Sequence, residues 1–274
     1  MEEFIKNVIM GLVQGFSEFL PISSSGHLVL FGDWLQVNEV NNTHLLLSIV
    51  VHLGTLSAVL VYFREDVKRM IQKLPDVPRF VKNGMRVEEE GDEQTAMILY
   101  IFLGSIPAAI IGFTFKDQLE MLFSNKEAVL IALMFNAAVL WSSRYTKEKS
   151  MKMNAVFAVL IGCAQAMAIV PGISRSGMTI VFALWLGLTR SSSASFSFLL
   201  SIPVILGASL LELKDIGLGQ LSSAQILNFS GACLAAAISG YFAIKLINAI
   251  IQKQKFEYFA VYCLAVSATS LMML

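Results

Sequence analysis

The chain has 274 residues, of which 56% are hydrophobic and 15% charged, and its mean hydropathy is +0.69. Because soluble domains average about 25% charged residues, this composition excludes an ordinary soluble protein. Lys plus Arg equals Asp plus Glu at 20 each, and a net charge of zero offers no basic surface for nucleic acid. The three cysteines are far apart within apolar segments, which fits neither a disulfide framework nor a metal-ligand pair.

The first apolar segment, residues 8–31, is broken. Its interruptions are Glu18, Pro21, the run Ser23-Ser24-Ser25-Gly26, and His27. Proline removes a backbone donor and glycine favours turns, so the chain should leave the helix here. At membrane depth such a break is tolerated only inside protein or beside a water-filled cavity. We therefore expect a re-entrant helix pair, with no cleaved signal peptide before it, since no cationic region precedes the apolar stretch.

Three uninterrupted spans follow, at residues 44–63, 95–115 and 127–145, each near the roughly 20 residues that a bilayer-crossing helix needs. The loop after the first span collects seven basic residues, which are Arg64, Lys68, Arg69, Lys73, Arg79, Lys82 and Arg86. Cytoplasmic loops are enriched in Lys and Arg, so this loop is expected inside. Two further crossings then bring the next basic group inside as well, namely Arg144, Lys147, Lys149 and Lys152.

A second broken segment, residues 153–188, precedes three more expected spans at 194–212, 226–250 and 257–274. Its interruptions are Pro171-Gly172 and Ser174-Arg175-Ser176-Gly177. The fold class expected is therefore an all-α polytopic membrane protein, in which each half has one re-entrant helix pair and three transmembrane helices. The halves are residues 1–150 and 151–274 of a single membrane domain, residues 1–274.

The two broken segments are also alike in sequence. A gapless shift of 151 residues pairs Gly11 with Gly162, Gln14 with Gln165, Ile22 with Ile173, Ser23 with Ser174, Ser25 with Ser176 and Gly26 with Gly177. Because an odd number of crossings separates the copies, the second is inverted relative to the first. Inverted repeats with broken helices place their tips near the midplane of many transporters.

Ionisable residues within the apolar segments are Glu18, His27, His52 and Arg175. A charge at a helix centre costs roughly 2.5–3.5 kcal/mol on insertion scales, so such residues usually face a partner or a polar cavity. If the tips meet, Glu18 and Arg175 are counter-charges, either as a structural pair or as parts of a site. His52 fits a hydrogen bond between helices as well as a place in the cavity.

The tips together offer the groups that bind a tetrahedral oxyanion. Arg175 is flanked by Ser174, Ser176 and Gly177, and the other tip supplies Ser23, Ser24, Ser25, Gly26 and His27. An arginine fork, hydroxyls and the N–H groups of a helix start suit phosphate, sulfate or carboxylate. Glu18, which shares a helix face with Gln14, could hold a divalent cation beside bound phosphates. His27 could transfer a proton and Ser24 could be a nucleophile; a serine-glycine break can equally be a packing device.

Two motifs resemble those of the bacitracin-resistance type of undecaprenyl-diphosphate phosphatase. The first is Gly11-Leu-Val-Gln-Gly-Phe-Ser-Glu-Phe-Leu-Pro-Ile-Ser-Ser-Ser-Gly-His27 and the second is Pro171-Gly-Ile-Ser-Arg-Ser-Gly177. The resemblance covers nearly the whole chain, including Ser195-Phe-Ser-Phe-Leu-Leu-Ser-Ile-Pro203. It implies an enzyme of the plasma (inner) membrane that converts undecaprenyl diphosphate to the monophosphate, recycles the carrier for cell-wall synthesis and confers bacitracin resistance.

The resemblance also implies roles for single residues. Arg175 corresponds to the phosphate-binding arginine, and Glu18, Ser24 and His27 correspond to the acidic residue, serine and histidine of the first motif. Substrate-binding partners are then Ser23, Ser25, Gly26, Ser174, Ser176, Gly177, Gln14 and Gln165, and Glu18 is the metal ligand for Mg²⁺ or Ca²⁺. Some family members carry a second glutamate where this chain has Gln14, so metal use could be weaker here.

Alternatives stay open at this point. A prenyl-phosphate flippase or transporter would use the same broken helices, and a structural membrane subunit would need Glu18 and Arg175 only as a pair. The resemblance implies a site facing the outer side, with membrane lipid and undecaprenyl diphosphate as partners and no nucleic acid. The oligomeric state is open, a homodimer included.

Overall fold

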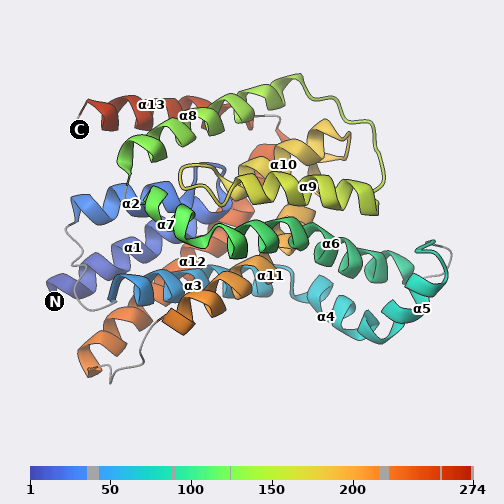
Figure 1. Ribbon diagram of the computed structural model, residues 1–274, viewed down its shortest axis with the longest axis horizontal. Coiled ribbons are helices and arrows are strands. Elements are labelled where there is room, and N and C mark those ends of the chain that lie inside the picture. The colour runs from blue at the N-terminus through green and yellow to red at the C-terminus, as the bar shows by residue number, and fades with distance from the viewer. Residues whose placement is uncertain (36–42, 88–90, 124, 216–221, 254, 273–274) are drawn as a thin grey trace.

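A computed structural model of the chain describes residues 1–35, 43–87, 91–123, 125–215, 222–253 and 255–272. These residues form helices and contain no strand, which confirms the all-α prediction. The helices, shown in Figure 1, are α1 (Glu2–Phe19), α2 (Ser24–Trp34), α3 (Thr43–Tyr62), α4 (Arg64–Lys73), α5 (Val77–Lys82), α6 (Asp92–Thr114), α7 (Lys116–Phe123), α8 (Lys126–Ser142), α9 (Ala155–Met167), α10 (Arg175–Trp185), α11 (Arg190–Asp215), α12 (Ser223–Gln252) and α13 (Tyr258–Leu271).

Five segments of the described chain are long and apolar enough to cross a membrane. They are Leu45–Tyr62, Asp92–Thr114, Lys126–Tyr145, Arg190–Leu213 and Ser223–Gln252, in agreement with five of the six expected spans. The sixth expected span, 257–274, is a correction: α13 has 14 residues, and residues 273–274 lie outside the described part. At 1.5 Å per residue α13 is about 21 Å long, shorter than the roughly 30 Å hydrocarbon core of a bilayer.

Both expected breaks are present. Helix α1 ends at Phe19 and α2 begins at Ser24, whose preceding residue Ser23 accepts a hydrogen bond from the Gly26 N–H at 3.3 Å. Helix α9 ends at Met167, and α10 begins at Arg175. The preceding residue, Ser174, caps α10 in the same way, because its Oγ accepts a hydrogen bond from the Gly177 N–H at 3.1 Å. Serine caps stabilise helix starts by satisfying N–H groups that lack an intrahelical partner. The serines of both runs therefore restart helices after each break.

The broken pairs are held by close helix crossings. Helix α1 packs along α12 and α9 packs along α6, while α3 lies on α12 and α11 on α6. A Cβ added at Gly11 would lie 2.2 Å from the Ala232 carbonyl oxygen, and one added at Gly162 would lie 2.4 Å from the Gly104 oxygen. Small residues permit such backbone approach between membrane helices, so these two glycines set the positions of α1 and α9.

The Gly162→Ala variant is expected to unfold at a lower temperature in detergent. Its new methyl group meets backbone of α6, and such overpacking typically costs about 1–3 kcal/mol. Gly207→Ala on α11 is the matched control, because a Cβ there meets nothing within 4 Å. Thermal unfolding followed by tryptophan fluorescence compares the two. Equal midpoints for both variants would contradict the close crossing.

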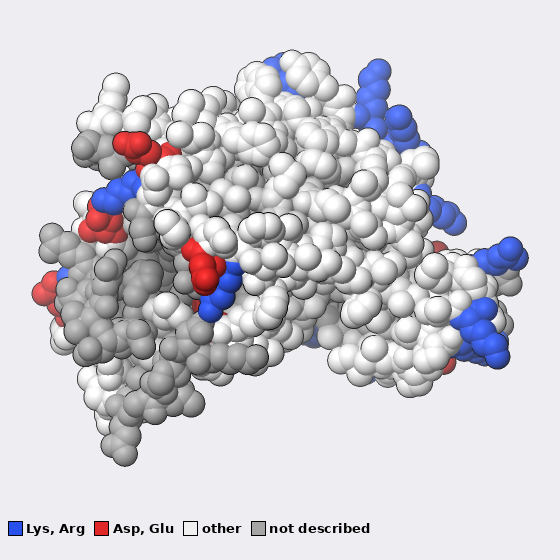
Figure 2. Space-filling model, in the orientation of Figure 1, with Lys and Arg blue, Asp and Glu red and all other residues white. Residues whose placement is uncertain are grey.

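Charge is distributed unevenly along the molecule. Figure 2 shows Lys and Arg gathered at the end where α4 and α5 lie, and mostly uncharged side chains over the face between the two ends. Figure 1 places the chain that follows α8 at this same end. The basic groups of residues 64–86 and 144–152 are thus on one side, as the sequence predicted. The uncharged belt and the five long apolar helices make this a multi-pass membrane protein.

Candidate functional site

The tips of the two broken helix pairs meet, and a buried ion pair joins them. Arg175 Nη2 lies 2.5 Å from Glu18 Oε1, with 13% and 7% of the two side chains exposed. Ser176 of the second tip donates a hydrogen bond to the Leu20 carbonyl of the first at 3.2 Å. The arginine also donates to the Ser197 carbonyl of α11 at 3.3 Å. Two charges far apart in the sequence are therefore neutralised against each other inside the bundle.

Glu18 is the centre of this polar cluster. Its second oxygen, Oε2, accepts a hydrogen bond from Ser24 Oγ at 2.7 Å and another from Gln14 Nε2 at 3.0 Å. Gln14 lies one helical turn before Glu18 on α1, as expected from their spacing. Four of the residues singled out from the sequence, Gln14, Glu18, Ser24 and Arg175, are thus directly connected.

Two helix N-termini converge on the same carboxylate. Ser24 is the first residue of α2 and Arg175 is the first residue of α10, and both side chains bond Glu18. The starts of both helices therefore lie within a side-chain length of one point. Helix N-termini carry partial positive charge and free N–H groups, which favour an anion. With the guanidinium, they offer an anion several donors in one place.

The remaining predicted serines and glycines shape the tips and make no hydrogen bond to Glu18 or Arg175. Ser23 and Ser25 share a hydrogen bond at 3.2 Å, and Ser174 and Ser176 share one at 3.1 Å. The N–H groups of Gly26 and Gly177 donate hydrogen bonds to the capping hydroxyls of Ser23 and Ser174. Gln165 has no hydrogen bond to Glu18 or Arg175; its Nε2 donates to the Gly104 carbonyl of α6 at 3.5 Å.

Asn136 of α8 is a residue that the sequence reasoning missed. Its amide is fully buried, donates to the Pro21 carbonyl of the first tip at 3.1 Å, and accepts from the Ser174 N–H of the second tip at 3.0 Å. One side chain thus bridges both loops. A polar residue in the middle of the apolar span 127–145 was the available signal, since such residues usually have a partner or a function.

His27 makes its hydrogen bonds outside the ion pair. Its Nδ1 lies 2.8 Å from the Ser23 carbonyl and its Nε2 lies 2.8 Å from the Tyr262 hydroxyl of α13. Because a carbonyl can only accept, Nδ1 is the donor, and the neutral ring accepts the tyrosine proton at Nε2. The two rings also stack, with centroids 5.7 Å apart. Tyr262 is the second residue that sequence reasoning missed, because it is one aromatic residue among many in an apolar helix.

His52 is hydrogen-bonded on its own helix. Its Nδ1 donates a hydrogen bond to the Ser48 carbonyl oxygen at 2.8 Å, because a carbonyl can only accept. The imidazole is half-buried. The hydrogen bond given for His52 lies within α3, not between helices, and a place in the cavity stays a prediction.

The residues of the cluster fit a cation held partly by substrate, and not a cage made of protein alone. Within the part of the chain that the structure describes, no three His, Cys, Asp or Glu side chains gather as a metal site. Glu18 is joined by the Gln14 Oε1 atom, which is buried without a hydrogen-bond partner. One carboxylate plus neutral oxygens, completed by phosphates and waters, is a common environment for Mg²⁺.

Comparison with known proteins gives a family match over most of the chain. The model of a family described as "Bacitracin resistance protein BacA" matches residues 7–269. A protein of Elusimicrobium minutum named undecaprenyl-diphosphatase is 41% identical over 262 residues, covering 95% of this chain and 94% of that protein. Proteins with the same name from Halothermothrix orenii and Methanobrevibacter smithii are 42% and 37% identical, each covering 95% of this chain and 94% of the relative.

Proposed function

Because the chain belongs to the bacitracin resistance protein BacA family, we propose that it hydrolyses undecaprenyl diphosphate to undecaprenyl phosphate and inorganic phosphate in the membrane. The observation that carries this proposal is the buried Arg175–Glu18 pair at the joined starts of α2 and α10. The relatives named undecaprenyl-diphosphatase supply the substrate and the reaction.

Arg175 and the two helix starts bind the diphosphate in this proposal. The guanidinium has five N–H donors, of which the structure uses two groups, Nη2 on Glu18 and Nη1 on Ser197, so donors remain for phosphate. The first N–H groups of α2 and α10 add further donors. Phosphoryl transfer depends mainly on positioning and on neutralising charge, and fixed donors of this kind supply both.

Ser24 and Glu18 carry the proton transfer that we propose. The Ser24 hydroxyl already donates to Glu18 Oε2 at 2.7 Å, the geometry of a nucleophile and its general base. Ser24 Oγ attacks the terminal phosphorus while its proton passes to Glu18. The bond from phosphorus to the bridging oxygen breaks, and undecaprenyl phosphate leaves with that oxygen. Water then cleaves the phosphoserine and releases inorganic phosphate.

His27 stays a predicted proton carrier for the second half of this reaction. It follows Ser24 by one turn of α2, so both residues lie on neighbouring faces, yet its ring is engaged by Ser23 and Tyr262. Glu18, and not His27, is therefore assigned as the general base for Ser24.

A divalent cation, Mg²⁺ or Ca²⁺, would be held by Glu18 and Gln14 Oε1 and would neutralise charge on the diphosphate.

The Ser24→Ala variant tests the nucleophile. We expect kcat to fall by about 10²–10³-fold, since general-base activation of a hydroxyl contributes on this scale. With substrate labelled in its terminal phosphate, acid quenching should trap label on the wild-type protein and none on the variant. If Ser24→Ala keeps more than a tenth of the activity, water is the nucleophile and Ser24 only donates a hydrogen bond.

We also propose that the fold is an inverted repeat of residues 1–150 and 151–274. The packing is reciprocal, which supports this: α1 lies on α12 as α9 lies on α6, and α3 lies on α12 as α11 lies on α6. The closest contacts repeat as well, at Gly11 and Gly162.

In cells, this enzyme would recycle the lipid carrier of cell-wall synthesis at the plasma membrane, from a site open to the outer side, and raise bacitracin resistance.

Inorganic phosphate release from a prenyl diphosphate by the purified protein in detergent tests the activity itself. We expect release that falls when a chelator is added. A flippase, which remains the rival, would bind the lipid and move it between leaflets of a vesicle without releasing phosphate. Folded protein that binds substrate and releases no phosphate would overturn the phosphatase proposal in favour of transport.

A further inference from the structure

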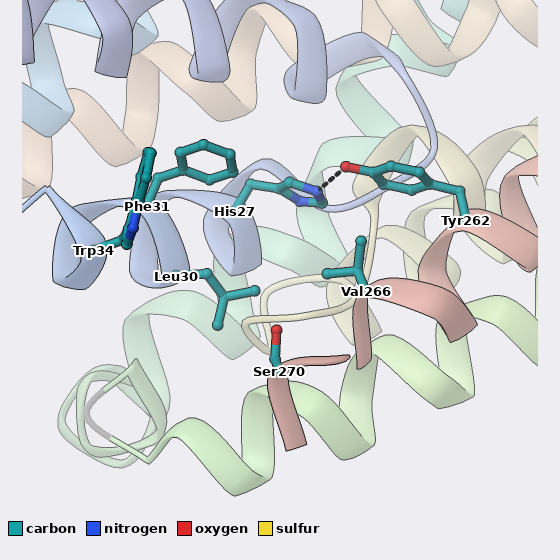
Figure 3. A pocket seen from close by; sticks show the side chains of 7 residues that line it. All are labelled: His27, Leu30, Phe31, Trp34, Tyr262, Val266 and Ser270. Atoms are coloured by element: carbon teal, nitrogen blue, oxygen red, sulfur yellow. Dashed lines mark hydrogen bonds between the residues drawn. The ribbon is translucent and has the colours of Figure 1, made fainter. Parts of the chain in front are cut away.

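A groove runs between α2 and α13, beside His27. Its volume is about 240 Å³, and Figure 3 shows the side chains that line it: His27, Leu30, Phe31, Trp34, Tyr262, Val266 and Ser270. In that view Leu30 and Val266 face the same space from the two helices. Nothing in the chemistry described above uses this space.

The lining follows helix periodicity on both walls. His27, Leu30, Phe31 and Trp34 are spaced as one face of α2, and Tyr262, Val266 and Ser270 are spaced as one face of α13. Residues three and four apart on a helix are neighbours on its surface. One face of each helix therefore lines the groove, with mainly aliphatic and aromatic side chains and with His27, Tyr262 and Ser270 as its polar members.

One end of the groove is polar and buried. There His27, with 3% of its surface exposed, accepts the hydrogen bond from Tyr262 that Figure 3 draws. His27 is three residues after Ser24, which bonds Glu18. The groove therefore starts within about one helical turn of the proposed phosphate cluster. At the other end Trp34, which is 75% exposed, opens it to the surroundings of the protein.

We propose that this groove holds the first isoprene units of the substrate hydrocarbon while the diphosphate is bound at Glu18 and Arg175. The inference rests on the proposed function, and it adds where the lipid tail leaves the site. A prenyl diphosphate joins its hydrocarbon directly to the reacting group, so an apolar path must begin beside the phosphate cluster. The groove is such a path. Since a cavity of about 150 Å³ holds a benzene molecule, it has room for one or two five-carbon units.

The buried polar end favours this occupant over a bulk phospholipid or a second copy of the chain. A phospholipid keeps its charged headgroup at the membrane surface, whereas this groove has its polar end inside the protein, at His27. A helix of another copy would present a broad face, whereas the groove ends at two polar side chains, His27 and Tyr262. A linear hydrocarbon with a buried anionic head matches both ends.

Photolabelling tests the location. A farnesyl diphosphate analogue with a diazirine on its first isoprene unit is irradiated with the protein in detergent at low temperature, and labelled peptides are identified by mass spectrometry. We expect label on Leu30 or Val266, removed by excess unmodified farnesyl diphosphate. Label elsewhere would overturn the proposal, as would label on these residues that farnesyl diphosphate fails to displace, which would assign the groove to lipid in general.

Chain-length selectivity tests the consequence for turnover. Val266→Trp fills the groove, and we expect the ratio of kcat/KM for farnesyl diphosphate to that for methyl diphosphate, which has no isoprene unit, to fall about tenfold or more. Val261→Trp, on an exposed face of α13 outside the groove, is the matched control and should keep the wild-type ratio. Equal ratios in both variants would overturn the groove assignment.

The two failures are distinguishable. If the wild-type protein releases no phosphate from any prenyl diphosphate, the proposed function fails, and the labelling experiment still reports whether the groove takes a prenyl chain. The wild-type protein could instead release phosphate while the label misses the groove residues and Val266→Trp leaves the kcat/KM ratio unchanged. The proposed phosphatase activity is then supported, and the hydrocarbon tail lies elsewhere. Crosslinks that join two copies through Leu30 or Val266 would mark the groove as a subunit contact and also overturn the proposal.

Discussion

The Arg175→Ala variant is expected to lower kcat/KM for phosphate release by about a thousandfold or more. Removal of one preorganised donor to developing charge typically costs about 10²–10³-fold, and this arginine supplies several donors at once and also balances Glu18. Arg175→Lys should recover only a small part, because an ammonium group keeps the charge but loses the planar fork. The measurement is phosphate release from a prenyl diphosphate by purified protein in detergent.

Arg190→Ala provides the matched control. Arg190 forms an ion pair with Glu148 at the first turn of α11, away from the tips, and its loss should leave turnover within about twofold because a partly exposed pair contributes little. If the structural-subunit alternative holds, Arg175→Glu combined with Glu18→Arg should restore function. We expect the exchanged pair to stay inactive, since the positive charge would then lie on α1 and not at the start of α10. Near-normal hydrolysis by folded Arg175→Ala would refute the phosphate-binding role.

The Asn136→Leu variant is expected to have the largest effect on stability, about 2–5 kcal/mol in the free energy of unfolding. Leucine fits a similar volume but leaves the Ser174 N–H buried without its partner and the Pro21 carbonyl with only the weak Cys263 Sγ contact at 4.0 Å. Each unsatisfied buried group costs about 1–3 kcal/mol. Since these two groups belong to opposite tips, turnover should fall together with stability. Thermal unfolding in detergent and phosphate release at a temperature where the variant is folded measure the two effects.

Asn248→Leu on α12 is the matched control for this change. Asn248 is half-buried and donates one hydrogen bond to the Tyr62 hydroxyl at 3.1 Å. Replacing Asn248 therefore leaves no backbone group without a hydrogen-bond partner. We expect a much smaller shift in the unfolding temperature and unchanged turnover. If Asn136→Leu behaves like Asn248→Leu, Asn136 does not hold the tips together.

The membrane class and the broken helices followed from the sequence, because both are local properties. Apolar runs near 20 residues predict spans, and Pro21, Gly172 and the serine runs predict breaks with capped restarts. Helix length at the end of the chain was harder to predict, since hydrophobicity continues past the point where α13 ends. The gathering of basic residues at one end of the molecule also followed from the sequence, because loops on one side of a bilayer collect them independently of packing; that this end is cytoplasmic stays a prediction.

Other features depended on contacts between distant residues, which no local pattern encodes. The sequence by itself determined that Glu18 and Arg175 needed partners within the apolar bundle, because isolated charges there are costly. Only the tertiary structure decided that Ser24 bonds Glu18, that His27 turns to Tyr262, and that Asn136 joins both tips. The reason is geometric: the direction in which a side chain points is known only after its helix has packed against neighbouring helices. In this protein, close crossings at single glycines position those helices.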